Sequence, residues 1–562
     1  MLKMRCTPAS LADRRGWPGG EPASLFESCQ DHEERAELGA AWLDVCPEEA
    51  LAFVVSSQQD RGATLAHVDR ELDLAPLGHD ALRIEARGRV GLEQVAALPE
   101  SVLGHVRDLT VTQLRPDDGA RFSETVTAAR FPALTRLKVG GQAAVGEAVL
   151  GLIGEHLTDF TYAAKGLGAS QVKKLAAYPL SRVTLYGLPE DAALPLLSLE
   201  TLRSLRLNYC PFPHKHLKLL AKLPALRDLA LVDHGLTKTT TKTLATLDNL
   251  QALDLSGNDR VDDGSWARLG ALAQLERLTL NGNQVGAKTL AAVAPLPLVA
   301  LHLDKTKIAA LGGLPKMTAL QTLSLVEAAP DAEGWSALGR LPQLRRLVLA
   351  RVRARKEQLA RLTELGSLRH LDLGGCGLKA EDLTPLTKLT SLRELNLEGN
   401  RGLADGGMTA LTSLPLTGLD VSRCKLTTAG LESLTAIEPL EWLAIADNGI
   451  SDGTPLGELQ RLRWLHVGNN PIGTSAQAMG ALSALVELYA QGCALEDGFG
   501  AVVAELPALR RLFVWENNLG DDAVAVMAPM KGLRLVNMVS NPLTDAGRRK
   551  LTLALSNCTF EW

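Results

Sequence analysis

Two stretches of the sequence show the same pattern: Leu392-Arg-Glu-Leu395-Asn-Leu397-Glu-Gly-Asn400 and Leu368-Arg-His-Leu371-Asp-Leu373-Gly-Gly-Cys376. Leucine stands at the first, fourth and sixth positions, and asparagine or cysteine stands at the ninth. The first leucine recurs every 22 to 25 residues, at Leu134, Leu157, Leu180, Leu202, Leu226, Leu250, Leu275, Leu298, Leu320, Leu344, Leu368, Leu392, Leu416, Leu440, Leu462, Leu485, Leu509 and Leu533. Such regular recurrence predicts an array of repeated structural units.

Each repeat predicts a short strand followed by a short helix. In the strand, alternate residues face opposite sides, so the fourth and sixth leucines point inward. The second half often begins Gly-x-x-x-Leu, as in residues 430–434 and 286–290, and its apolar spacing indicates a helix. A helix is wider than a strand, so stacked units curve with parallel strands on the concave face and helices on the convex face. Two degenerate units are expected before Leu134, near Leu82 and Val106.

The pattern resembles the leucine-rich-repeat family over about residues 79–562. The 24-residue unit with Gly-x-x-x-Leu is most similar to the ribonuclease-inhibitor-like repeats and to the bacterial GALA-type repeats. This resemblance implies an α/β solenoid, a curved horseshoe that recognises proteins. GALA-type proteins carry an F-box whose Leu-Pro-x-Glu opening is missing here, so the resemblance does not extend to that role.

The two ends differ from the repeats. Residues 1–24 are rich in Pro, Gly and Arg and are predicted to be disordered. Residues 25–78 contain two helical patterns and are predicted to form a small helical cap on the first repeat. An independent activity of this region is the alternative. Residues 79–562 are predicted to be one domain of about 20 repeats, in which residues 559–562 cover the C-terminal end.

Composition limits the kinds of partner. Lys and Arg total 59 and Asp and Glu total 64, so no charge excess indicates nucleic acid or an anionic membrane. The first 20 residues lack the apolar run of a signal peptide, and eight cysteines without a CxxC pair are typical of a reduced compartment. We therefore expect a cytoplasmic monomer, while secretion as an effector without a cleaved signal remains open.

No motif predicts catalysis or a cofactor. HExxH, P-loop, GxSxG and dinucleotide patterns are missing, and His214-Lys-His216 lacks further ligands for a metal. Asp372 and Asp420 should lie two strands apart, a separation that suits an inverting hydrolase. A flat ladder of strands, however, has no enclosed pocket to shift a pKa. We therefore predict a protein that is not an enzyme, with no cofactor and no metal.

Aromatic residues predict the binding site. The third, fifth and seventh positions of each repeat should project from the concave face, and none of them is aromatic between Leu202 and Leu440. The following repeats place six rings there: Trp442, Trp464, His466, Tyr489, Phe513 and Trp515. Exposed Trp and Tyr side chains are enriched in binding hot spots. The alternative is that these rings stack on one another and only stabilise the sheet.

The predicted function is a protein–protein interaction scaffold whose partner the sequence does not name. Two alternatives from other classes stay open. In one, the N-terminal region acts as an effector or regulator while the repeats select its target. In the other, the aromatic rings recognise a carbohydrate or glycopeptide.

Overall fold

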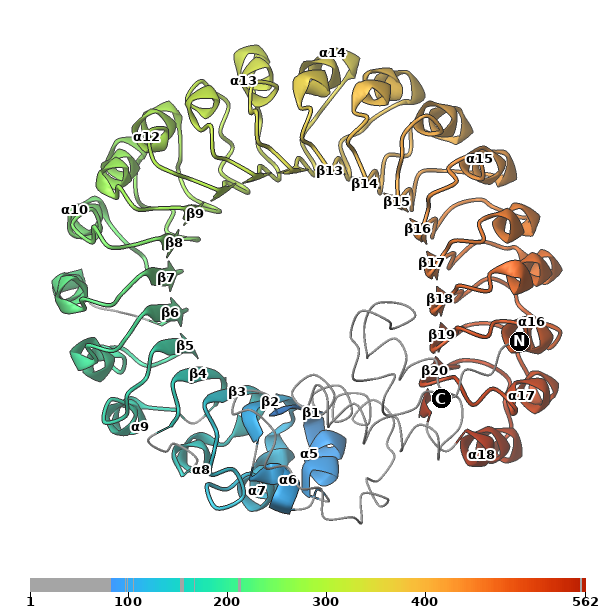
Figure 1. The fold of residues 1–562 in the computed structure, drawn as a ribbon, viewed down its shortest axis with the longest axis horizontal. Helices are drawn as coiled ribbons and strands as arrows, with labels where there is room; N and C mark the ends of the chain where they lie inside the picture. Colours follow the sequence, from blue (N-terminus) through green and yellow to red (C-terminus); the bar gives the residue numbers. More distant parts are fainter. Residues whose placement is uncertain are drawn as a thin grey trace, which may run out of the picture. The chain divides into compact units, whose positions relative to one another are not determined.

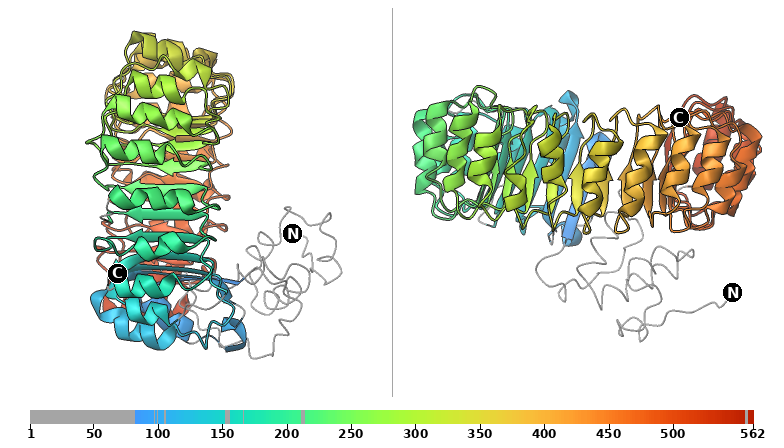
Figure 2. Two further views of the ribbon diagram at one scale, coloured as in Figure 1. Left: turned by 90° about the vertical axis from the view of Figure 1, so that its left-hand side faces the viewer. Right: turned by 90° about the horizontal axis from the view of Figure 1, so that it is seen from above.

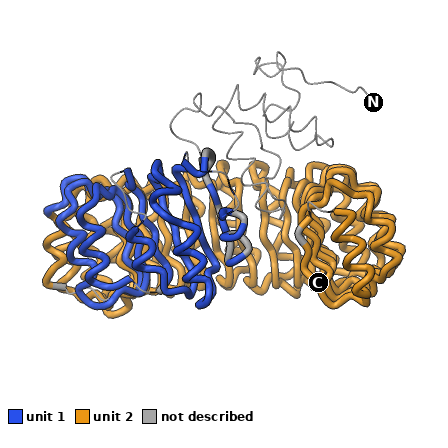
Figure 3. Tube along the Cα trace, turned by 90° about the horizontal axis from the view of Figure 1, so that it is seen from below, with its two compact units in different colours: residues 1–213, 222–225 blue, residues 214–221, 226–562 orange. Residues whose placement is uncertain are grey.

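The computed structural model describes residues 82–96, 98, 100–104, 106–151, 156–165, 167–210, 214–555 and 558–562. They form two compact units (Figure 3): unit 1 contains the described residues up to 210 together with 222–225, and unit 2 contains residues 214–221 and the described residues from 226 onward. The predicted N-terminal segment, residues 1–24, and the predicted helical cap, residues 25–78, lie outside the described residues.

Unit 1 is a series of parallel strands, each paired with the next along the chain. The strands are β1 (Leu82–Arg87), β2 (Val106–Leu114), β3 (Arg136–Ala144), β4 (Asp159–Lys165), β5 (Arg182–Tyr186) and β6 (Ser204–Asn208). The helical segments are α5 (Gly88–Ala96), α6 (Glu100–Leu103), η1 (Pro116–Asp118), α7 (Gly119–Thr125), α8 (Gly146–Leu150), α9 (Ala169–Leu175) and η2 (Leu194–Ser198). The degenerate repeats expected near Leu82 and Val106 are present as β1 and β2.

Unit 2 repeats the same arrangement with shorter strands. They are β7 (Asp228–Val232), β8 (Ala252–Asp254), β9 (Arg277–Thr279), β10 (Ala300–His302), β11 (Thr322–Ser324), β12 (Arg346–Val348), β13 (His370–Asp372), β14 (Glu394–Asn396), β15 (Gly418–Asp420), β16 (Trp442–Ala444), β17 (Trp464–His466), β18 (Glu487–Tyr489), β19 (Arg511–Phe513), β20 (Leu535–Asn537) and β21 (Thr559–Glu561). Each pairs in parallel with the next.

Helical segments alternate with these strands. They are η3 (His214–Lys222), α10 (Lys238–Leu244), α11 (Asp263–Trp266), η4 (Ala267–Ala271), α12 (Ala287–Val293), η5 (Leu314–Lys316), α13 (Ala332–Leu338), α14 (Lys356–Leu359), η6 (Ala360–Glu364), η7 (Ala380–Lys388), η8 (Asp405–Leu411), α15 (Thr428–Leu434), η9 (Thr454–Glu458), η10 (Gly473–Ala481), α16 (Phe499–Ala504), α17 (Asp521–Met527) and α18 (Asp545–Ala554). Within unit 2 the strands line the inner side of the curve and the helices its outer side (Figure 1). The helices lie side by side along that outer surface (Figure 2). The predicted solenoid is confirmed.

The core of each unit consists of the leucines that define the repeat. Leu392, Leu395 and Leu397 are buried, and so are the corresponding side chains of neighbouring repeats. A buried leucine contributes roughly 1.5–3 kcal/mol, and this burial comes from the stacked neighbours because one repeat cannot enclose its own side chains. Trp266 and Trp335 are also buried, in helices α11 and α13, as packing residues on the helical side.

The ninth position holds each turn to the preceding repeat. The amide of Asn400 donates to the carbonyls of Leu373 and Leu397, at 2.9 and 2.7 Å, and accepts from the backbone N–H of Leu378 at 3.0 Å. Asn258, Asn448, Asn470, Asn517 and Asn541 make equivalent bonds. These side chains satisfy backbone groups that the turn would otherwise leave buried without a partner.

The eighth position has a left-handed backbone in every repeat from Leu202 to Leu533. Its φ is between +54° and +76° whether the residue is glycine, as in Gly399, or carries a side chain, as in Arg351 and Arg423. The full series is Tyr209, Asp233, Gly257, Gly282, Lys305, Glu327, Arg351, Gly375, Gly399, Arg423, Asp447, Asn469, Gly492, Glu516 and Ser540. The chain therefore turns in the same way at the end of each strand.

The long strands β3 and β4 of unit 1 belong to repeats that lack this turn chemistry. The repeats that begin at Leu134 and Leu157 have Gln142 and Lys165 at the ninth position, and their strands β3 and β4 run for nine and seven residues. Strand β14, which Asn400 follows, has three residues. Without a buried amide to hold the turn, the chain stays extended further along the ladder.

Candidate functional site

The six predicted aromatic residues lie on one face of unit 2, on or directly after strands β16 to β19. Trp442 and Trp464 are paired in register at the third position of adjacent strands. His466, Tyr489 and Phe513 are paired in the same way at the fifth position. Trp515 follows Phe513 by two residues, so its side chain projects to the same face. We call these six residues the aromatic surface.

Every ring of the aromatic surface contacts another. Trp442 stacks on Trp464, with centroids 5.0 Å apart and planes inclined by 19°. Tyr489 stacks on Phe513 at 4.2 Å and 1°. Trp464 connects the two stacks through Tyr489 at 5.5 Å, and His466 contacts both Trp464 and Tyr489. Trp515 ends the series, edge to face with Phe513 at 6.2 Å. The sequence-based grouping of the six residues therefore corresponds to one continuous cluster.

The rings differ in exposure. Trp442 is 36% exposed, and the other five are half-buried. The mutual stacking that the sequence analysis weighed as the alternative is thus present, together with an exposed surface. Stacked pairs contribute about 0.5–1.5 kcal/mol beyond the area that they bury. Trp464 and Tyr489 are the most embedded of the six, with three ring contacts each.

Polar groups fix the orientation of two rings. The hydroxyl of Tyr489 donates to Glu487 at 2.6 Å, and Glu487 also lies 3.5 Å from the guanidinium of Arg511. Burial, and then the carboxylate of Glu487, raise the pKa of Tyr489. The Nε2 atom of His466 lies 2.8 Å from the amide nitrogen of Gln491. Burial lowers the pKa of His466, which favours a neutral imidazole.

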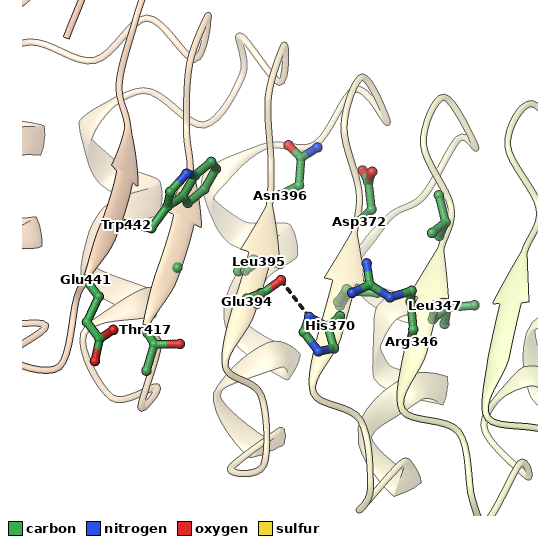
Figure 4. A pocket seen from close by; sticks show the side chains of 13 residues that line it. Arg346, Leu347, His370, Asp372, Glu394, Leu395, Asn396, Thr417, Glu441 and Trp442 are labelled. Atoms are coloured by element: carbon green, nitrogen blue, oxygen red, sulfur yellow. Dashed lines mark hydrogen bonds and ion pairs between the residues drawn. The ribbon is translucent and has the colours of Figure 1, made fainter. Parts of the chain in front are cut away.

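A hollow of about 500 Å³ adjoins the aromatic surface (Figure 4). It extends over strands β12 to β16, and Trp442 belongs both to it and to the aromatic surface. Its polar lining includes Arg346, His370, Asp372, Glu394, Asn396, Thr417 and Glu441. The sequence analysis did not identify this hollow. The available signal was Gly418, a glycine at a third position where neighbouring repeats carry large side chains.

The fifth-position carboxylates have a structural role. Asp372 and Asp420 flank Asn396 in the register of β13 to β15, as the repeat spacing predicts. Asp372 accepts from the N–H of Gly374 and Asp420 from that of Ser422, each at 2.8 Å, and Asn396 binds Glu398 in the same way. Burial raises the pKa of Asp420, as do the charges of Glu398 and Asp372. These groups begin the turn after each strand.

The other candidate sites from the sequence also have structural explanations. His216 lies in η3, and residues 82–562, apart from the short gaps in the description, contain no group of three His, Cys, Asp or Glu side chains that could hold a metal ion. The expectation that no pocket on this face shifts a pKa is wrong for Asp420, since burial raises the pKa of that carboxyl group, and Asp372 lines the hollow.

One comparison with known proteins concerns the repeat itself. Residues 388–411, which contain the stretch Leu392–Asn400, match a family model described as Leucine Rich repeat. The match covers one repeat of the array. No curated protein matches the chain significantly.

Three solved structures are similar to parts of the chain. An internalin from Listeria monocytogenes is 25% identical, covers 57% of this chain and 88% of its own, and has a TM-score of 0.44. A leucine-rich-repeat protein from Leptospira interrogans is 20% identical, covers 70% and 92%, and has a TM-score of 0.40. The mouse RP105/MD-1 complex is 17% identical, covers 82% and 88%, and has a TM-score of 0.49.

The ninth-position cysteines fit the leucine-rich-repeat pattern. Cys210, Cys376, Cys424 and Cys493 are buried and free of disulfides. The thiol of Cys424 donates to the carbonyl of Leu397 at 3.2 Å, which is the bond that asparagine makes elsewhere. Burial raises the pKa of Cys376 and Cys424 to about 12 and that of Cys493 to about 11. These thiols are structural donors.

None of the helices among the described residues has the length and apolar character needed to cross a membrane.

Proposed function

We propose that this leucine-rich-repeat solenoid is a non-enzymatic scaffold that binds a protein partner through the strand face of unit 2. The observation that carries the proposal is the aromatic surface, a continuous series of rings from Trp442 to Trp515. Trp and Tyr dominate binding hot spots because a rigid ring supplies a large contact area and loses little conformational entropy.

The repeat architecture itself does not require aromatic residues at these positions. The third positions of β12 to β14 are Arg346, His370 and Glu394, and those strands pair in the same register as β16 and β17. The strand ladder therefore forms without aromatic residues at these positions, so we infer that the rings have a role other than strand pairing. A contiguous, partly exposed apolar area of this kind marks a site of interaction.

The ring geometry favours a protein over a carbohydrate. A sugar-binding platform needs several open ring faces side by side, but stacking covers one face of each of these four rings: Trp442, Trp464, Tyr489 and Phe513. Stacked in this way, the series resembles the apolar core of a protein interface with a polar margin formed by Glu487 and Arg511. The alternative of an active N-terminal region concerns residues outside those described.

Affinity capture from the native host tests the proposal, with the immobilised full chain as bait. We expect Trp515→Ala to weaken capture about thirtyfold, since a hot-spot truncation costs roughly 2 kcal/mol. Its single ring contact, with Phe513, predicts little change in the thermal transition. Trp464→Ala should weaken capture and also lower stability, because three ring contacts are lost.

Tyr186→Ala is the matched control, since Tyr186 is an aromatic residue that is 41% exposed on β5 of unit 1. We expect it to capture the same partner as the unmodified chain. Identification of the captured molecule as protein or glycan separates the two classes of ligand. Normal capture by both tryptophan variants would show that the aromatic surface is only structural.

A further inference from the structure

The hollow beside the aromatic surface contains a narrow slot above Gly418. In register, Gly418 lies between Glu394 on β14 and Trp442 on β16. A methyl group placed on Gly418 would lie 3.3 Å from Cγ of Glu394 and 3.4 Å from Cε3 of Trp442. Gly418 is itself buried, so the gap between the stem of Glu394 and the indole of Trp442 is at most one atomic layer thick.

The indole in this slot has one face to offer. Trp464 covers one side of Trp442 at 5.0 Å, while the glycine on the opposite strand leaves the other side without a neighbouring side chain at the same position. Trp442 is the most exposed ring of the aromatic surface, at 36%. The face of an indole attracts cations because its π electrons make it negative.

Carboxylates dominate the charges of the hollow. Its lining contains three carboxylates, one guanidinium and one imidazole: Asp372, Glu394, Glu441, Arg346 and His370. Glu394 lies on β14 and Glu441 directly before β16, the two strands that flank β15, and the carboxylate of Glu394 points toward His370 (Figure 4). Glu394 and His370 contact each other through Oε2 and Nδ1, at 2.6 Å, so Oε1 of Glu394 is the oxygen that can accept from a ligand. Arg346 lies three strands from Gly418.

Carboxylates on these strands also act on a neighbouring group, on which burial has the larger effect. Asp420, two residues after Gly418, has a raised pKa, first because of burial and also because of the charges of Glu398 and Asp372. A bound cation would relieve the repulsion among these carboxylates. The hollow therefore favours a positively charged occupant over a neutral or acidic one.

We propose that the slot above Gly418 binds an arginine side chain of the protein partner, stacked on Trp442 and paired with Glu394 and Glu441. This inference rests on the proposed function and specifies the chemistry of the partner. A guanidinium is flat, which suits a gap of one atomic layer, and it combines stacking on an aromatic face with forked donation to carboxylates. A lysine ammonium is not planar and fits the slot less well.

Short peptides of the form acetyl-Gly-Gly-X-Gly-Gly-amide test this directly, where X is arginine, citrulline or lysine. Their affinities for the full chain are measured by ligand-observed NMR at low ionic strength. We expect the arginine peptide to bind about tenfold more tightly than the neutral citrulline peptide, and to weaken as salt is raised. The lysine peptide should bind more weakly than arginine. Equal binding of arginine and citrulline overturns the proposal, and equal binding of arginine and lysine overturns the assignment of a guanidinium.

Two kinds of variant locate the binding. Gly418→Val fills the slot and should weaken the arginine peptide at least tenfold, whereas Ala300→Val, at the same position of β10 outside the hollow, should have no effect. Glu394→Gln and Glu441→Gln remove charge without filling the slot, and each should weaken the arginine peptide severalfold. They also decide the question if Gly418→Val fails to fold. Unchanged binding by the two glutamine variants refutes the proposal.

The peptide experiment and the capture experiment can fail separately. If Trp515→Ala abolishes capture of a protein partner while the peptides do not distinguish arginine from citrulline, the scaffold function stands and the arginine slot is wrong. If the arginine peptide depends on Gly418 while both tryptophan variants capture normally, the slot stands and the proposed role of the aromatic surface is wrong.

Discussion

Replacing Asn400 with alanine removes three hydrogen bonds at one point in the ladder of repeats. The amide donates to the carbonyls of Leu373 and Leu397 and accepts from the N–H of Leu378, and the side chain is fully buried. The two carbonyls keep long contacts of 3.4 Å with the backbone N–H groups of Cys376 and Asn400, but the Leu378 N–H is left without its acceptor. A buried unsatisfied group costs about 1–3 kcal/mol and a lost hydrogen bond about 1 kcal/mol, so we expect a local loss of roughly 3 kcal/mol.

Hydrogen exchange measured by mass spectrometry tests this value, because repeat arrays open locally and a single unfolding free energy need not apply. Peptides from residues 370–402 should exchange on the order of a hundredfold faster in Asn400→Ala. Asn400→Cys should lose less, since Cys424 makes the corresponding donation in its own repeat. Asn396→Ala is the control, because Asn396 makes one bond at the edge of the same strand. If Asn400→Ala and Asn396→Ala exchange alike, the ninth position is not what holds the repeats together.

Three further predictions concern titratable groups. Cys376, Cys424 and Cys493 should resist a neutral thiol reagent at pH 8 in the folded chain and react after unfolding; rapid native labelling would contradict their burial. Because burial raises the pKa of Cys376 and Cys424 from about 9 to about 12, their contribution to stability is complete below pH 9 and is lost as the pH rises toward 12. Chemical denaturation across that range should show a smaller decline in a Cys376→Ala, Cys424→Ala double variant. For His466 the pKa is lowered by burial, so its NMR titration should have a midpoint below 6.5, and its contribution to stability should fall as the pH drops below 6.5; a midpoint above 6.5 would refute this.

Sequence reasoning predicted the fold because one physical requirement recurs in every repeat. Leucines at the first, fourth and sixth positions must be buried between neighbours, as Leu392, Leu395 and Leu397 are. The same periodicity placed Trp442 and Trp464 on adjacent strands and His466, Tyr489 and Phe513 beside them, since the register follows from the repeat. The repeat period alone was therefore enough to predict that these candidate residues lie together.

Other features depend on side-chain geometry that the repeat does not encode. The angle between Trp442 and Trp464 and the uneven exposure of the rings follow from rotamers and packing. The slot at Gly418 depends on what its neighbours Glu394 and Trp442 leave open, so the glycine alone did not reveal it. The long strands β3 and β4 arise because Gln142 and Lys165 stand at the ninth position, where other repeats have asparagine or cysteine.

At the left-handed eighth position of the repeats from Leu202 to Leu533, the side chain varies while the backbone conformation stays the same. A residue with a side chain accepts a conformational cost there of about 1 kcal/mol or more, which glycine avoids. Charged side chains at this position form ion pairs with the eighth position of a neighbouring repeat: Arg351 lies 2.9 Å from Glu327, and Arg423 lies 3.2 Å from Asp447. Since glycine and charged residues follow the same backbone path, either can replace the other without moving a strand.

Residues along this edge can therefore be exchanged one at a time. Each repeat from Leu202 to Leu533 contributes one residue, about 4.8 Å from the next, to a row outside the leucine core. The row runs beside the aromatic surface, because Glu516 directly follows Trp515 and, after burial, the charges of Asp447 and Arg423 act on the pKa of His466. Substitutions along the row can alter charge and solubility, or add a second point of contact for a partner, while the fold of the repeats stays the same. For protein engineering, the eighth positions are sites at which the surface charge of the solenoid can be redesigned.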